Sequence, residues 1–171
     1  MPDSMKKELE RLGVDLGRRP REAVEARTEP LRLRMQEGMS PCIIGYSVEG
    51  AFNRHLDIGR VAELLCMLGE VESDEQEGWS LVLDVRVFEE GAVIAKGAEP
   101  EKIRKNVEKV RRAVVKAEEC VGCGVCIARC NEGALTLQQG KVHVIVEKCI
   151  HCGRCTEPCP AVSFGDSAFE L

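Results

Sequence analysis

Eight of the ten cysteines in the 171-residue chain lie between residues 120 and 159, in two runs of identical spacing. The first run is Cys120, Cys123, Cys126 and Cys130, and the second is Cys149, Cys152, Cys155 and Cys159. Clustering this dense favours metal or metal-cluster binding over disulfides. If the chain works in a reducing compartment, the same conclusion follows, because disulfides are rare there.

Each run follows the pattern C-x₂-C-x₂-C-x₃-C. The first three cysteines form a tight loop whose sulfurs converge, and we expect the fourth to lie on the following short helix and point elsewhere. This is the spacing of bacterial [4Fe–4S] sites, in which the fourth cysteine of each run ligates the other cluster. The pattern therefore predicts two [4Fe–4S] clusters. One is held by Cys120, Cys123, Cys126 and Cys159, and the other by Cys149, Cys152, Cys155 and Cys130.

Zinc and disulfides are the alternative interpretations of these cysteines. Structural zinc takes four ligands from paired C-x₂-C knuckles separated by a longer gap. Two uninterrupted four-cysteine runs fit that arrangement poorly, and soft anionic thiolate suits iron–sulfur clusters well.

Residues 112–165 resemble the bacterial-type two-cluster ferredoxin domain, on the strength of the two complete runs at a fixed offset. The resemblance implies a small α+β unit with pseudo-twofold symmetry and one-electron transfer. The repeat extends beyond the cysteines, since Gly124 corresponds to Gly153. We expect each run to follow a strand, one formed by "AVVKAE" (113–118) and one within 134–146, where two strands turn at Gln139-Gly140.

The rest of the chain predicts an α+β protein in three parts. Residues 1–40 are a charged helical arm, 41–111 a small α+β domain, and 112–171 the ferredoxin-type domain. The expected elements of the second part are strands at 42–48, 80–88 and 92–97 and helices at 57–69 and 99–115. Asp57 is positioned to cap the first helix, and alternation places Leu81, Leu83, Val85 and Val87 on one face of a single strand.

A second resemblance concerns "CIIGYSVEGAFNRHLDIGRVAELLCMLGEV" (42–71) and "RAVVKAEECVGCGVCIARC" (112–130). These segments resemble the C-terminal part of archaeal phosphoadenosine phosphosulfate reductase-like proteins, which carry a two-cluster module behind a nucleotide-binding domain. The "SGG" phosphate loop of that domain does not occur in the sequence. The resemblance therefore implies an electron-delivering subunit whose partners are a separate reductase chain and an electron donor, with sulfur metabolism as the setting. The alternative is a redox enzyme whose N-terminal domain binds substrate.

Composition sets further expectations. The net charge of −5 argues against a nucleic-acid partner. No apolar run approaches the ~18 residues of a membrane span, and the first residues lack the apolar stretch of a secretion signal. We expect the protein in the cytoplasm. We also expect its source to be an anaerobe.

Several other residues suggest weaker hypotheses. Cys42 is a candidate redox thiol, Cys66 a packing residue, and His151 a loop residue that could tune a cluster. No catalytic residue is expected. Asn131 follows Cys130 where Pro160 follows Cys159, so the two clusters should be unequal.

Overall fold

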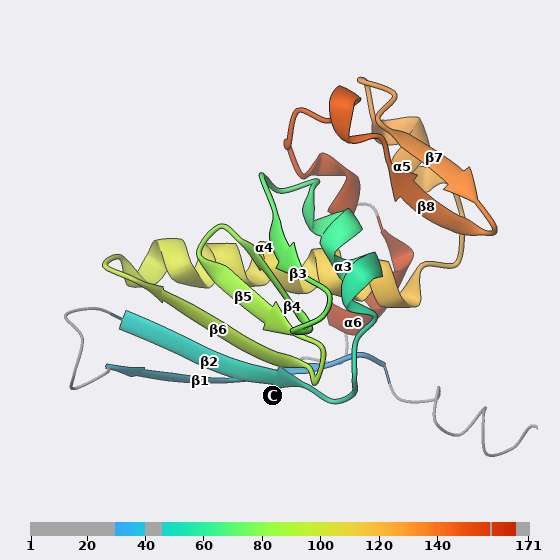
Figure 1. The fold of residues 1–171 in the computed structure, drawn as a ribbon. Coiled ribbons are helices and arrows are strands. Elements are labelled where there is room, and N and C mark those ends of the chain that lie inside the picture. The colour runs from blue at the N-terminus through green and yellow to red at the C-terminus, as the bar shows by residue number, and fades with distance from the viewer. Residues whose placement is uncertain (1–29, 40–45, 158, 167–171) are drawn as a thin grey trace, which may run out of the picture. The chain divides into compact units, whose positions relative to one another are not determined.

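The computed structural model describes residues 30–39, 46–157 and 159–166 (Figure 1). Its first part comprises β1 Leu33–Met39, β2 Tyr46–Phe52, α3 Ile58–Leu65, β3 Glu72–Asp74, β4 Trp79–Val82, β5 Val85–Phe88, β6 Ala92–Gly97 and α4 Pro100–Glu119. Its second part comprises α5 Val125–Arg129, β7 Leu135–Gln138, β8 Lys141–Val144, the 3₁₀ helices η1 Val146–Lys148 and η2 Arg154–Thr156, and α6 Pro160–Asp166. The protein is therefore α+β, as predicted.

Six strands form an antiparallel sheet in the order β1-β2-β6-β5-β4-β3. The edge strand β1 corrects the prediction of a helical arm over residues 1–40, because Leu33 to Met39 pair with Phe52 to Tyr46. Residues 31–34 instead have the two-residue period of a strand, because Leu31 and Leu33 are buried while Arg32 and Arg34 are exposed. The predicted helices of residues 1–29 lie outside the described residues.

The single strand predicted over 80–88 is wrong. The chain reverses at Leu83-Asp84, where both residues have positive φ, 51° and 63°, and Val82 pairs with Val85 across the turn. Positive φ at both central residues is the requirement of a two-residue hairpin turn, for which Asn-Gly is the usual sequence signal. Because the sequence lacks that signal, its alternation predicted one continuous strand. In the structure Ser80 and Val82, rather than Leu81, are the buried residues of β4.

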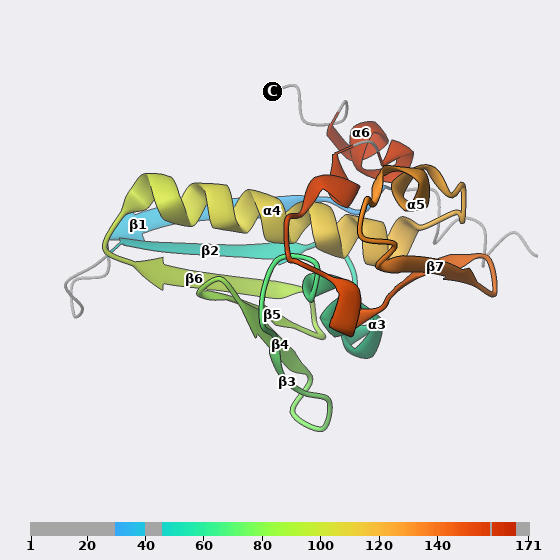
Figure 2. The same ribbon diagram turned by 90° about the horizontal axis from the view of Figure 1, so that it is seen from above.

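Helices α3 and α4 pack against each other, and α4 also contacts β2, β5 and β6 (Figure 2). The Asp57 carboxylate accepts a hydrogen bond from the Arg60 amide at 3.1 Å, so the predicted cap of α3 is confirmed. Helix α3 ends at Leu65 rather than at Gly69 and continues as a turn. Ile103, Val107 and Val110 of α4 are buried on the face toward the sheet, as predicted.

The strand expected before the first cysteine run is also wrong, because residues 113–118 belong to α4. An apolar segment that is buried on all sides has no clear period, so its length and β-branched residues were misleading. The predicted hairpin at Gln139-Gly140 is confirmed, with positive φ at both residues. Buried residues of the cysteine region, including Cys126, Leu135, Val142 and Cys159, join the same hydrophobic cluster as the sheet.

Candidate metal centre

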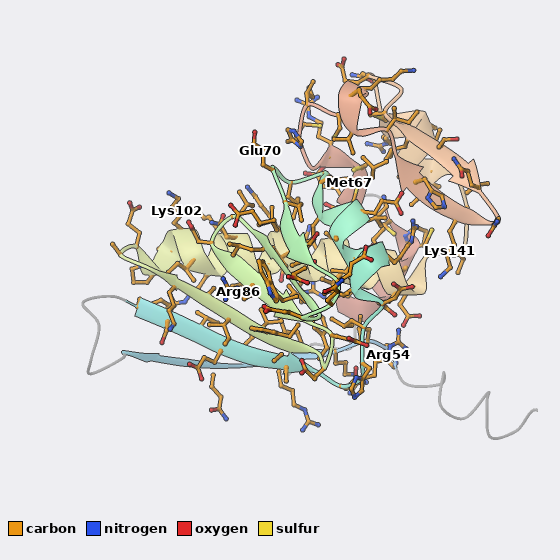
Figure 3. The ribbon with its side chains drawn as sticks, in the orientation of Figure 1. Arg54, Met67, Glu70, Arg86, Lys102 and Lys141 are labelled. Atoms are coloured by element: carbon orange, nitrogen blue, oxygen red, sulfur yellow. The ribbon has the colours of Figure 1, made fainter. Side chains whose placement is uncertain are left out.

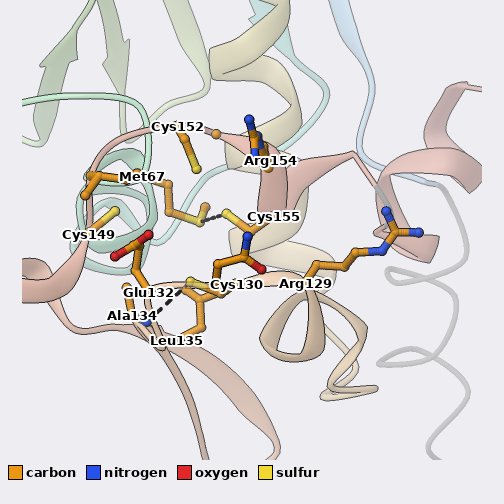
Figure 4. A pocket seen from close by; sticks show the side chains of 13 residues that line it. Met67, Arg129, Cys130, Glu132, Ala134, Leu135, Cys149, Cys152, Arg154 and Cys155 are labelled. Carbon is orange, nitrogen blue, oxygen red and sulfur yellow. Dashed lines mark hydrogen bonds between the residues drawn. The ribbon is translucent and has the colours of Figure 1, made fainter.

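Each predicted set of four cysteines lines one hollow in the structure. Cys130, Cys149, Cys152 and Cys155 line a cavity of about 120 Å³ (Figure 4). Cys120, Cys123, Cys126 and Cys159 line a smaller one of about 20 Å³. In both cases three cysteines come from one run and the fourth comes from the other run. Within the described ranges, no group of three or more His, Cys, Asp or Glu side chains is arranged to hold a single metal ion.

The two cysteine loops share one backbone conformation, which gives the sequence repeat a structural meaning. Gly122 and its counterpart His151 both have positive φ, 69° and 55°. Gly124 and Gly153, also left-handed, precede α5 and η2. Left-handed residues reverse the chain tightly, so each loop curls around its own cavity. Of these four positions only His151 has a side chain, and the left-handed conformation is strained for a residue with a Cβ atom.

The fourth cysteine of each run lies next to the end of a helix and not within a helix, so the position predicted from the sequence is wrong. Cys130 is the residue that ends α5, and Cys159 immediately precedes α6. The residue after each of them lines the same cavity, Asn131 in one case and Pro160 in the other. The departure from the repeat at Asn131 therefore lies in the wall of the cavity that Cys130 lines.

Backbone amides point at two of the sulfurs. The Ala134 N–H lies 3.3 Å from Cys130 Sγ, and the Val142 N–H lies 3.4 Å from Cys120 Sγ. Both donors belong to the hairpin segment of residues 134–144. Hydrogen bonds to ligand sulfur are one of the means by which a protein sets a cluster's reduction potential. The hairpin also closes on the first loop so tightly that a Cβ at Gly122 would meet the Gly140 carbonyl oxygen at 2.3 Å.

The segment after α3 supports the second cysteine loop. Met67 is fully buried, and its Sδ lies 3.0 Å from Cys155 Sγ. Figure 3 shows Met67 beyond the end of α3, toward the cysteine loops.

The Cys66 carbonyl accepts from His151 Nδ1 at 2.5 Å, so Nδ1 carries a proton. His151 thus links its loop to the end of α3 through the backbone of Cys66. The pKa of the Cys66 thiol is raised by burial, and the neighbouring Cys149 and Glu63 raise it further.

Lys116 is the buried cation of this region. It is 1% exposed, and its Nζ donates to the Cys155 carbonyl at 2.6 Å. It also lines the cavity of the other cysteine set. Burial raises the pKa of Cys155 to about 11, while the Lys116 charge acts in the opposite direction. The predicted strand over residues 113–118 gave Lys116 no role; a single lysine inside the apolar run "AVVKA" (113–117) was the available signal.

Other contacts join the cysteine region to the front of the chain. The Glu63 carboxylate accepts from the Val144 amide at 3.2 Å and contacts His143 Nδ1 at 2.8 Å. Arg60 donates to the Val142 carbonyl. Residues 52–57 serve a similar linking role, since Arg54 pairs with Glu119 and the Asp57 amide donates to Glu118 at 2.8 Å. Cys42 lies outside the described residues.

In a comparison with known protein families, residues 112–160 match the model of a 4Fe-4S dicluster domain. The searches of curated proteins and of solved structures found no match. The family match supports an iron–sulfur, ferredoxin-type domain with a role in electron transfer. None of the comparisons supports the resemblance to phosphoadenosine phosphosulfate reductase-like proteins. Along the described ranges, no helix has the length and apolar character needed to cross a membrane.

Proposed function

We propose that this chain holds two [4Fe–4S] clusters and relays single electrons to a separate reductase chain. The observation that carries the proposal is the crossed lining of the two cavities, because each contains three cysteines of one run and the fourth of the other. The crossed set is the arrangement that the C-x₂-C-x₂-C-x₃-C spacing serves in two-cluster domains. Four soft thiolates per cavity and amide donors at sulfur fit such a cluster chemically.

The same ligand sets support an electron carrier rather than an enzyme. A cluster with four protein thiolates has no iron position open to substrate. The two loops are neighbours, since α5 contacts η2, and Lys116 reaches both of them. Adjacent clusters would supply a two-step electron path between a donor and an acceptor.

The acceptor in this proposal is the catalytic chain of a reductase, and sulfur metabolism is its suggested setting. The basis is the resemblance of residues 42–71 and 112–130 to the reductase-like proteins, combined with the missing "SGG" loop. We place the activity in the cytoplasm, where thiols stay reduced.

Anaerobic chemical analysis tests the proposal. The chain is purified without oxygen, its iron and acid-labile sulfide are counted, and it is titrated with dithionite while electron paramagnetic resonance (EPR) records unpaired spins. The expected result is about eight iron and eight sulfide per chain, with two signals that appear and disappear reversibly. Zinc without sulfide would overturn the cluster assignment. Redox-silent clusters would leave only a structural role, and turnover of a sulfur-containing substrate by the chain alone would identify an enzyme.

A further inference from the structure

A basic groove of about 470 Å³ lies between α4 and the second cysteine loop. Four cationic residues of α4 line it: Arg104, Lys105, Lys109 and Arg112. Two acids, Glu108 and Glu157, also line it, so cations outnumber acids by four to two. The chain as a whole carries a net charge of −5. The groove is thus positively charged on a chain whose net charge is negative.

The groove adjoins one of the predicted cluster sites. His151 and Cys152 form part of its wall, and both side chains are exposed. Cys152 also lines the cavity of the Cys130 set. The neighbouring Ile150 is 63% exposed. An apolar residue beside a charged rim is the usual composition of a protein docking surface. A molecule seated in the groove would therefore approach within one residue's width of the second cluster.

The length of the basic surface favours a protein over a small anion. Arg104 and Arg112 are eight residues apart on one helix, a distance of ~12 Å at 1.5 Å per residue. One phosphate cannot contact both ends of that span, whereas a row of carboxylates on a protein surface can. The outermost cations are also engaged locally, since Arg104 contacts Glu101 and Arg112 contacts Glu108. Lys105 and Lys109 are exposed between them.

We infer that this groove is the docking surface for an acidic electron-transfer protein, which exchanges electrons with the cluster beside Cys152. The inference rests on the proposed electron-transfer function and names the surface and the charge of the partner. Electrostatic attraction of this kind accelerates encounter and weakens as salt screens it. Electron-transfer contacts are small, so a few charges can dominate the rate.

Stopped-flow kinetics with an acidic flavodoxin as the probe tests the inference. The chain is reduced with dithionite, excess reductant is removed, and oxidised flavodoxin is added. One electron leaves the chain, and the flavin takes it up with one proton from water. We expect Lys105→Glu with Lys109→Glu to slow the transfer about tenfold at low salt, and the difference to shrink at high salt. The milder pair Lys105→Gln with Lys109→Gln should give a smaller loss and covers a failure of the first to fold.

The matched control reverses two exposed charges on the sheet, Arg34→Glu with Lys96→Glu, and should slow the transfer much less. Equal slowing in both double variants would show a general charge effect and overturn the docking surface. Unchanged rates in the groove variants would also overturn the docking surface. A titration with inorganic phosphate adds a third arm: saturable binding that the groove variants abolish, together with unchanged flavodoxin rates, would assign the groove to a small anion.

Reduction by dithionite separates this inference from the proposed function. A wild-type chain that dithionite cannot reduce overturns electron transfer and the docking surface together. A chain that is reduced normally, but whose groove variants react with flavodoxin at the wild-type rate, overturns the docking surface alone.

Discussion

Lys116 donates a 2.6 Å hydrogen bond to the carbonyl of Cys155 while its side chain lines the cavity of Cys120, Cys123, Cys126 and Cys159. One buried cation thus touches the surroundings of both cysteine sets. Its backbone belongs to α4, the helix that also packs on the sheet. Lys116 is thus one of the side chains that link the helix beside the sheet to both cysteine loops.

Replacing Lys116 with methionine should lower the reduction potentials of both proposed clusters. A nearby positive charge favours the added electron, and in a buried site its effect is poorly screened. We expect shifts of the order of 60 mV, a tenfold change in a one-electron equilibrium. EPR-monitored redox titration measures them. Lys102→Met, an exposed change on the same helix, is the control; equal shifts in both variants, or none, would contradict the prediction.

Single cysteine variants should lose clusters in crossed pairs. Cys130→Ala should remove the signal that Cys149→Ala removes, because both residues line the larger cavity. Cys159→Ala should instead match Cys120→Ala, which affects the smaller cavity. EPR of the reduced variants distinguishes the two signals. If Cys130→Ala matched Cys120→Ala, each run would hold its own cluster and the crossed assignment would be wrong.

Substitutions at Asn131 and at Pro160 should each shift mainly the reduction potential of one proposed cluster. Asn131→Pro removes a backbone N–H in the wall of the larger cavity and restrains φ there. It should shift the potential of the cluster assigned to Cys130 more than that of its neighbour. Pro160→Asn is the reciprocal change and should act mainly on the cluster assigned to Cys159. Redox titration of both variants would refute this if the two potentials moved together.

Truncation of Met67 should destabilise the protein and expose the larger cavity. Met67→Ala removes a fully buried side chain next to Cys155, a change that costs about 2–5 kcal/mol in protein cores. Met67→Leu keeps the volume and should cost less than about 1.5 kcal/mol. Anaerobic thermal unfolding compares the two variants. Met67→Ala should also lose its visible absorbance faster in air, and equal loss from both variants would exclude a role for Met67 in shielding this cavity.

The hairpin at Gln139-Gly140 was predicted because its signal is local, and the proposed cysteine sets rest on the ligand spacing within each run. Ligand spacing and turn residues act over a few positions, so the printed sequence contains them. Asp57 was recognised as a cap, and the stripe of Ile103, Val107 and Val110 as a buried helix face, for the same reason. In each case neighbouring residues alone specify the conformation.

The tertiary structure decided what depends on residues far apart in the chain. The chain turns at Leu83-Asp84 although leucine rarely adopts positive φ, because β4 and β5 gain their pairing only if the chain reverses there. The apolar segment before Cys120 is helical because α4 packs on both the sheet and α3. The positions of Lys116 and Met67 beside Cys155 follow from that packing, through contacts 39 and 88 residues apart in sequence. The cysteine spacing by itself predicted the two ligand sets, and long-range burial determined the charges and sulfur atoms that surround those cysteines.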